Sequence, residues 1–169
     1  MRRIFAALTG FGLAVSFGFA AKVDCDQRYA ERGVFSVCPP TGWKVVQIPG
    51  VQYRAFFGDL KGNAGSNINF ETESFNGSLK EYVDLGVKAM ESAGDVKLIK
   101  RENFTAKNVK GERIILENSM VKEMTLRLTL YIFELNKSTK MAITCIAPTS
   151  DASGSAAVFE EMINSFQKL

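Results

Sequence analysis

The chain has 169 residues, no histidine, 21 basic and 18 acidic side chains, and a formal net charge of +3 at pH 7. The absence of histidine excludes Ser-His-Asp and Cys-His nucleophile systems and removes the usual zinc-binding sets. So small a net charge argues against nucleic-acid binding, which needs concentrated positive charge. A chain of this length suits one domain with a sizeable core. We expect no resident cofactor.

The first twenty residues predict an export signal. Arg2 and Arg3 form a basic start, and an uncharged apolar run follows as far as position 19. This run is short for a membrane span of about 20 apolar residues, and small residues suit cleavage between Ala20 and Ala21. Cleavage would lower the formal charge from +3 to +1, because both arginines leave with the signal. An uncleaved membrane anchor is the alternative.

Export sets the expected compartment. We expect the periplasm or the extracellular space, with a thylakoid lumen as the alternative, and membrane contact through the signal alone. The mature chain then carries Cys25, Cys38 and Cys145 where disulfides form. Three single pairings are possible, and each leaves one thiol over. We favour a bridge that involves Cys25, because a covalent link would anchor the polar arm that we expect over residues 21–33. Three reduced thiols are the alternative.

Turn residues divide the first half of the domain into short strands. Pro39-Pro40 and Pro49-Gly50 interrupt apolar runs, since proline cannot donate to a strand ladder. Trp43, the single tryptophan, follows the first turn and is expected to pack over the sheet edge. The expected strands are Phe35–Val37, Trp43–Ile48, Val51–Phe57 and Ser66–Glu73.

The clearest local prediction is an amphipathic helix over Leu79–Ala93. Ser78 and Glu81 have the spacing of a capping box, in which hydroxyl and carboxylate each satisfy a free backbone N–H. Apolar side chains then recur at helical spacing. Gly94 stands where a left-handed C-cap belongs.

The second half alternates more regularly and ends in another helix. Polar residues at 136–139 predict a tight turn between two strands. The order of strands, helix, antiparallel strands and helix predicts an α+β fold, with an antiparallel sheet of about six strands in a single domain over residues 34–169. The expected elements are strands at Val96–Thr105, Val109–Asn118, Glu123–Leu135 and Met141–Ala147, then a helix over Ala156–Lys168.

One strand carries the most conspicuous polar pattern. Period two places Asn67, Asn69, Glu71 and Glu73 on one face of the segment 66–73, opposite its apolar side chains. Such oxygens could hold Ca²⁺ or Mn²⁺, but neighbours on one face are roughly 7 Å apart, too far for one ion unless another segment contributes. We therefore rank a partner-binding face above a metal site. A solvated sheet face is the plain alternative.

Several short motifs follow one another along the chain, and none of them is a catalytic signature. They are Phe35-x-Val37, Pro40-x-Gly42-Trp43, Ile68-Asn69, Ser78-Leu79-x-x-Tyr82, Gly111-Glu112-Arg113, Tyr131-x-Phe133, Ile143-Thr144-Cys145, Phe159 and Ser165-Phe166. In this order they resemble the PsbP-like family over nearly all of the mature chain.

This resemblance implies an α/β/α sandwich and a binding role. The family's namesake is an extrinsic subunit of photosystem II, and a nuclear-transport factor that binds the Ran GTPase shares its fold. Two features depart from the family. In the expected mature chain only about a dozen residues precede Phe35, where the namesake has a long charged arm, and histidine-based metal sites cannot exist here. The photosystem role is therefore not carried over, and a bacterial exported relative fits better.

The sequence thus predicts a monomeric, exported, non-enzymatic binding or assembly domain with a protein partner. One rival is an envelope enzyme that uses carboxylates alone, Glu71 with Glu73 or Glu117, in a concave pocket that raises a carboxyl pKa. The other rival is a carrier of a small apolar ligand. It predicts a cavity lined by Leu126, Leu128, Leu130, Tyr82 and Met90.

Overall fold

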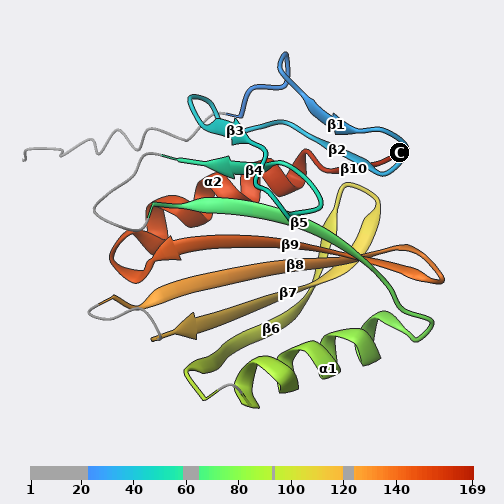
Figure 1. Cartoon of the computed structure of the whole chain (residues 1–169), viewed down its shortest axis with the longest axis vertical. Coiled ribbons are helices and arrows are strands. Elements are labelled where there is room, and N and C mark those ends of the chain that lie inside the picture. Colours follow the sequence, from blue (N-terminus) through green and yellow to red (C-terminus); the bar gives the residue numbers. More distant parts are fainter. Residues whose placement is uncertain (1–22, 59–64, 93, 120–123) are drawn as a thin grey trace, which may run out of the picture.

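Two antiparallel sheets and two α-helices make up the structure, a computed structural model that describes residues 23–58, 65–92, 94–119 and 124–169. The expected export signal and its cleavage point at Ala20 and Ala21 lie outside these ranges. The expected α+β class is confirmed, with a main sheet of seven strands instead of about six (Figure 1). Its order is β3 (Lys44–Val46), β4 (Ala55–Phe57), β5 (Asn67–Ser74), β9 (Thr139–Pro148), β8 (Leu126–Asn136), β7 (Val109–Asn118) and β6 (Val96–Ala106).

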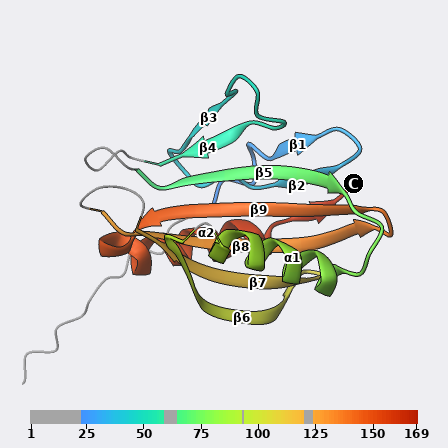
Figure 2. The ribbon, with the colours of Figure 1, turned by 60° about the horizontal axis from the view of Figure 1, so that its bottom comes forward.

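The small sheet and the helices complete the layers. The small sheet has the order β1 (Tyr29–Glu31), β2 (Phe35–Val37) and β10 (Gln167–Lys168). Helix α1 (Leu79–Ser92) lies on one face of the main sheet, and α2 (Ala152–Asn164) lies on the other (Figure 2). Among the helices of the described residues, none has the length and apolar character to cross a membrane.

Strand β8 shows how the two layers arise, because it is apolar on both sides. Leu130 and Ile132 pack with Val83 and Val87 of α1, whereas the intervening Tyr131 packs in the other core with residues of α2. Successive strand residues point to opposite faces. The alternation in β8 therefore places one helix on each side, which is the α/β/α sandwich that the resemblance implied.

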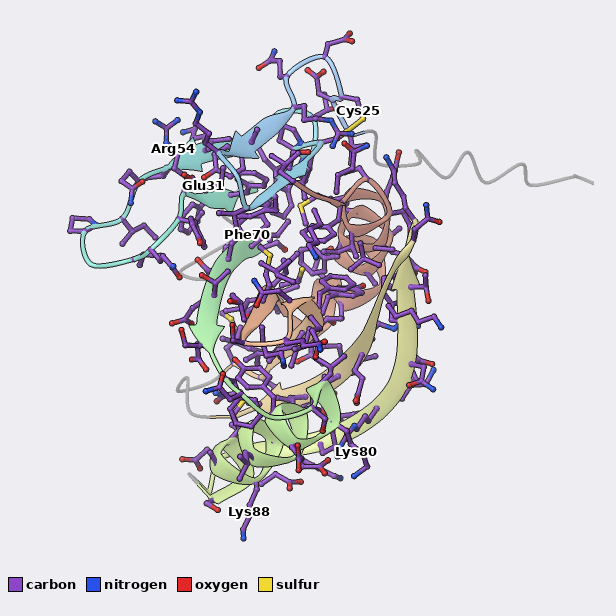
Figure 3. All side chains as sticks on the ribbon, turned by 90° about the vertical axis from the view of Figure 1, so that its right-hand side faces the viewer. Cys25, Glu31, Arg54, Phe70, Lys80 and Lys88 are labelled. Atoms are coloured by element: carbon purple, nitrogen blue, oxygen red, sulfur yellow. A yellow bond between two sulfur atoms is a disulfide. The ribbon has the colours of Figure 1, made fainter. Side chains whose placement is uncertain are left out.

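The core on the α2 side is built largely from aromatic rings. Phe35 of β2 stacks on Phe70 of β5 with ring centroids 5.0 Å apart, and Phe133 stacks on Phe166 at 4.8 Å. Figure 3 places Phe70 between β5 and the strands of the small sheet. Trp43 lies beside the edge strand β3 and meets Phe159 of α2 edge to face. The predicted packing role of Trp43 is confirmed.

Helix α1 follows its sequence signals closely. The backbone N–H of Ser78 donates to Glu81 Oε2 at 2.8 Å, and the N–H of Glu81 donates to Ser78 Oγ at 3.2 Å, as a capping box requires. Gly94 has φ +92°, the left-handed region expected of a C-cap. Lys80 and Lys88 point away from the sheet (Figure 3). The helix therefore buries one side and leaves the charged side in solvent.

Both chain ends differ from the sequence prediction. Residues 29–31, expected in the polar arm, form β1 and pair with β2. The last helix spans Ala152–Asn164 instead of Ala156–Lys168. It ends early because Ser165 and Phe166 make a tight turn, with Phe166 fully buried, and the next two residues pair with β2 as β10. It begins early at a Ser-Gly-Ser segment where Ser155 is buried and bonded to Ser66 at 2.9 Å.

The bridge that the sequence favoured is present. Cys25 and Cys38 form a disulfide, and Cys145 is a free thiol buried in the α2-side core. Burial raises the pKa of the Cys145 thiol well above its usual range. The expectation that Cys25 takes part is confirmed, and Cys145 is a small core residue.

Candidate functional site

Strand β5 brings the four predicted polar residues together on one face. Asn67, Asn69, Glu71 and Glu73 face the α1 side, because the residues between them, Ile68 among them, are buried in the core on the α2 side. Glu71 and Glu73 are exposed, whereas the two asparagines are half-buried. Asn69 Nδ2 donates to Asn67 Oδ1 at 2.8 Å, so the amides are linked along the strand.

Helix α1 does not cover β5 on the α1 side of the main sheet. Its apolar side packs on β6, β7 and β8, and it crosses in front of them in Figure 2, with β5 and the β3–β4 hairpin extending beyond it. Arg101 of β6 fixes the helix there by binding Asp84 at 2.5 Å and Glu112 of β7 at 2.5 Å. The open half of the face therefore runs over β9, β5 and β4.

A hollow of about 410 Å³ lies on this open half, and we call it the β5 hollow. Its wall is the loop between β3 and β4, which Gln52 ties to β5. The N–H of Thr72 donates to Gln52 Oε1 at 2.9 Å, and Gln52 Nε2 donates to Thr72 Oγ1 at 2.8 Å. The residues that line the hollow are Gly50, Val51, Gln52, Asn69, Phe70, Glu71, Ala142 and Thr144.

The predicted Pro49-Gly50 turn shapes the wall of the β5 hollow. The N–H of Val51 donates to the carbonyl of Ile48 at 3.1 Å, and Gly50 has φ +80°. A turn with proline second and a left-handed glycine third is of type II. It directs the chain over the sheet, so that the loop reaches β5 at Thr72.

The two carboxylates of β5 have different surroundings. Tyr82 of α1 donates its hydroxyl to Glu73 Oε2 at 2.9 Å, which orients that side chain toward the helix. Burial, the hydrogen bond to Glu73 and the nearby charges raise the pKa of Tyr82, so its hydroxyl remains a donor at neutral pH. Glu71 makes no hydrogen bond or ion pair within the described part of the chain. Glu71 is thus the carboxylate available at the rim of the β5 hollow.

Lys140 is the residue beside the candidate site that sequence reasoning missed. It lies opposite Glu73 in the β5–β9 register, its side chain is fully buried, and Nζ is 3.0 Å from Glu134 Oε2. Nζ also donates to the carbonyl of Lys137 at 3.2 Å. A signal existed in the predicted hairpin, whose register places Lys140 beside Glu134. Glu71, Glu73 and Glu134 of β8 thus lie on this side of the sheet with two lysines: Lys140, which is already paired, and Lys44 of β3, which the register of β3, β4 and β5 places on the same side.

Within the described ranges, the fold does not bring together a set of ligands for the Ca²⁺ or Mn²⁺ site that the sequence suggested. Across the described ranges, no group of three or more Cys, Asp or Glu side chains is placed to hold a metal ion. Glu71 and Glu73 stand one strand repeat apart, roughly 7 Å. A shared ion would need a ligand from another segment. Within the described ranges, no other carboxylate forms such a group with Glu71 and Glu73.

The structure separates the residues of the two rival hypotheses. Glu117 lies on the opposite face of the main sheet from Glu71, where Arg127 Nη2 donates to Glu117 Oε1 at 2.6 Å, so these carboxylates cannot share a pocket. In the carrier hypothesis, Tyr82 and Met90 were expected to line a cavity. They pack instead against the α1-side core, together with Leu128 and Leu130.

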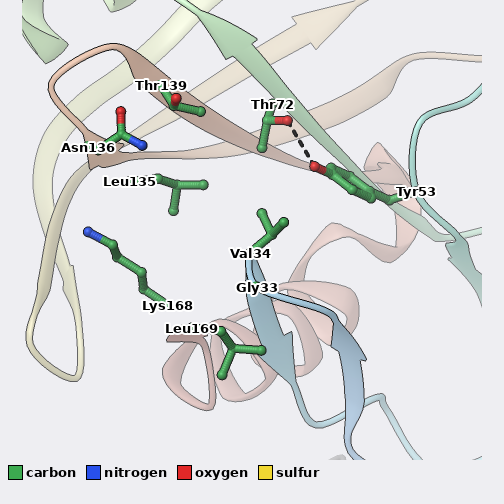
Figure 4. Close-up of a pocket in the computed structure, with 9 residues that line it drawn as sticks. All are labelled: Gly33, Val34, Tyr53, Thr72, Leu135, Asn136, Thr139, Lys168 and Leu169. Atoms are coloured by element: carbon green, nitrogen blue, oxygen red, sulfur yellow. Dashed lines mark hydrogen bonds between the residues drawn. The ribbon is translucent and has the colours of Figure 1, made fainter.

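A second hollow, of about 210 Å³, lies on the α2 side between the small sheet and the β8–β9 hairpin (Figure 4). Val34, Leu135 and Leu169 supply its apolar lining, and the Tyr53 hydroxyl lies 2.9 Å from Thr72 Oγ1. Strand β5 thus separates two hollows. The hollow on the α1 side carries a carboxylate at its rim, whereas the second hollow has Lys168 as its charged residue.

No protein-family model matches the chain, and no curated protein matches its sequence. Solved structures do match, with the α+β fold of PsbP. Cyanobacterial PsbP (CyanoP) from Synechocystis sp. PCC 6803 aligns with a TM-score of 0.63 at 15% identity, over 94% of this chain and 99% of that chain.

Two other solved structures share the fold. LpqN of Mycobacterium tuberculosis, involved in cell envelope biogenesis, aligns with a TM-score of 0.64 at 7% identity, over 83% of this chain and 87% of that chain. The Ran-binding protein Mog1p of Saccharomyces cerevisiae aligns with a TM-score of 0.59 at 14% identity, over 83% and 94%. At these identities the likeness establishes a fold similar to that of PsbP and nothing beyond the fold.

Proposed function

We propose that the chain is an exported, non-enzymatic binding or assembly domain of PsbP-like type, which holds a protein partner on the open half of its α1-side face. The face consists of Asn67, Asn69, Glu71 and Glu73 with the adjoining β5 hollow. The observation that carries the proposal is Glu71, an exposed carboxylate without a bonded partner in the described ranges, at the rim of a hollow in an uncovered sheet.

The chemistry of the face suits a basic segment of the partner. Three carboxylates and two lysines lie on this side of the sheet, and one of the lysines is already bonded to Glu134, so the local charge is negative. Asn69 and Thr144 offer hydrogen-bonding groups on the floor of the β5 hollow, and Val51 and Ala142 offer apolar contact. A lysine or arginine of the partner can place its stem on the apolar lining and its charged end at Glu71. Complementary charge of this kind also steers association.

The structural neighbours support a binding role. Mog1p is described as a Ran-binding protein, and LpqN as a protein involved in cell envelope biogenesis. We extend a protein-binding role, like that in the description of Mog1p, to the present chain and place it outside the cytoplasm. The disulfide between Cys25 and Cys38 supports export, because such bridges persist in oxidising compartments. In this proposal the chain acts as a monomer in the periplasm or the extracellular space after cleavage between Ala20 and Ala21.

The test reverses one charge at a time. Glu71→Lys places a lysine at the rim of the β5 hollow, whereas Glu91→Lys makes the same change at an exposed position near the end of α1. Each variant is used as bait on the native envelope fraction under mild cross-linking, and retained proteins are quantified against wild type. We expect Glu71→Lys to reduce retention of a specific partner about tenfold, while Glu91→Lys retains it. Equal retention by both variants would contradict the proposed face.

A further inference from the structure

The two sulfurs of the disulfide lie in different surroundings. Cys25 is exposed, whereas Cys38 is fully buried at the end of β2. The side chain of Arg28 reaches back to the bridge, and Nη2 donates to Cys38 Sγ at 3.0 Å. One sulfur therefore faces solvent, and the other is held against a guanidinium.

Arg28 is fixed in this position by two further hydrogen bonds. Nη1 donates to Ser36 Oγ at 3.1 Å and to the carbonyl of Ser165 at 3.1 Å. Cys38 is tied to the same segment, because its backbone N–H donates to Ser165 Oγ at 2.8 Å. None of these three hydrogen bonds uses the sulfur–sulfur bond, so each can hold Cys38 and the guanidinium together after that bond breaks.

No carboxylate among the described residues forms an ion pair with Arg28. A thiolate accepts a hydrogen bond from a cation far more strongly than a disulfide sulfur does, because charge-assisted hydrogen bonds are the stronger kind. Arg28 therefore stabilises a thiolate on Cys38 more than it stabilises the bridge.

Cys25 has the opposite electrostatic surroundings. Asp24 and Asp26 flank it in the chain, and Asp24 Oδ1 accepts hydrogen bonds from the N–H groups of Asp26 and Gln27. Negative charge on both sides disfavours a thiolate on Cys25. Of the two sulfurs, Cys38 is therefore the better leaving group, and a better leaving thiol makes thiol–disulfide exchange faster.

We infer that the Cys25–Cys38 bridge is a thiol-exchange site, which a dithiol reductant opens by attack on Cys25 with Cys38 as the leaving group. The attacking thiolate bonds to Cys25 Sγ, the bond between the two cysteines breaks, and its electron pair leaves on Cys38 Sγ beside Arg28. The second thiol of the reductant loses its proton to solvent and attacks the mixed disulfide. Cys25 leaves as a thiolate that takes a proton from solvent, and the reductant becomes a disulfide.

Opening the bridge removes the covalent link that anchors β1, a strand that packs on the aromatic core. The two cysteines are 13 residues apart, and the three-residue β1 lies between them. Tyr29 of β1 lies edge to face on Phe56 at 5.4 Å and beside Phe70 at 6.3 Å. After reduction, short strand pairing and these ring contacts hold segment 23–31 without a covalent link. This inference is independent of the proposed partner face on β5.

The test compares Arg28→Gln with Arg32→Gln, which removes the same charge from an exposed position in the turn between β1 and β2. The full chain is equilibrated in buffers of reduced and oxidised dithiothreitol, and free thiols are alkylated and counted by mass. We expect Arg28→Gln to lower the equilibrium constant for reduction about tenfold, about 30 mV, and Arg32→Gln to change it less than about twofold. Arg28→Lys, which keeps the charge, should restore most of the difference.

A second measurement uses the unmodified protein. Glutathione, a monothiol, is added in excess, the reaction is quenched early with iodoacetamide, and the adducts are located by peptide mass. We expect glutathione on Cys25 and the alkyl group on Cys38. Glutathione on Cys38, or an unchanged equilibrium constant in Arg28→Gln, would overturn the inference.

Discussion

The two faces of the main sheet differ in how completely they are covered. On the α2 side, the helix and the small sheet bury an aromatic core that includes Phe35, Phe70, Phe133 and Phe166, all at most 1% exposed. On the α1 side, a helix of 14 residues covers β6 to β8 and leaves β5 with its carboxylates open. The comparison teaches that one face provides most of the packing, and that the other leaves exposed the surface that we propose for partner binding.

The largest expected effect lies on the covered face. Phe133→Ala removes a fully buried ring that stacks on Phe166 and lies over Gly111, where an added Cβ would come within 2.6 Å of Phe133 Cδ1. We expect a loss of about 3–5 kcal/mol in the free energy of unfolding, measured by urea denaturation. Leu85→Ala, at a position 59% exposed, is the control and should change stability by less than about 0.5 kcal/mol. A loss below about 1 kcal/mol in Phe133→Ala would contradict this view of the aromatic core.

A smaller effect is expected beneath α1. Val83 is 1% exposed and packs in a core of aliphatic side chains. Val83→Ala removes two carbon atoms, and we expect a loss of roughly 2 kcal/mol, again by urea denaturation. A loss as large as that of Phe133→Ala would show that both faces provide packing equally and would break the comparison.

The capping box of α1 gives a pH dependence. The backbone N–H of Ser78 and then its hydroxyl donate to the carboxylate of Glu81, and these bonds lower the pKa of Glu81 below its ordinary value of 4.5. A lowered pKa in the folded state means that the stabilisation is complete above 4.5 and is lost as the pH falls through the lower folded value. We expect the stability difference between wild type and Glu81→Gln to be present at pH 7 and to shrink below pH 4.5, measured by thermal unfolding. A difference that grows on acidification would contradict this assignment.

The smallest effect on stability is expected on the open face. Glu71 is exposed and unpaired within the described ranges, so Glu71→Gln should change the free energy of unfolding by less than about 0.5 kcal/mol. The same variant should weaken partner binding, because it removes the charge at the rim of the β5 hollow. Chemical denaturation and titration with the captured partner measure the two quantities on the same samples. A clear loss of stability would mean that Glu71 supports the fold.

The difference between the faces also explains what the sequence could predict. Period two in residues 66–73 and the Ser78–Glu81 spacing are local patterns, and the structure keeps both. The burial of Lys140 depends on register across three strands, which places Glu73 on one side and Glu134 on the other. The early end of α2 depends on the burial of Phe166 and on pairing with β2, more than a hundred residues earlier. Local sequence patterns do not predict contacts between segments that lie so far apart in the chain.

The β3–β4 loop is an intermediate case. The Pro49-Gly50 turn could be predicted because both residues favour it. The tie from Gln52 to Thr72 could not, since a glutamine in a loop has many possible partners. The four polar residues of β5 were therefore predictable, and the wall that makes them part of a hollow was not.

Photo-cross-linking from the two faces tests the central claim most directly. A photoreactive amino acid is placed at Asn69, inside the β5 hollow, or at Ala157, an exposed position on α2. Both proteins are irradiated in the native envelope, and cross-linked products are identified by mass. The account predicts a specific product from position 69 and none from position 157. A product from position 157 alone would show that the partner binds the covered face and would contradict the proposed function.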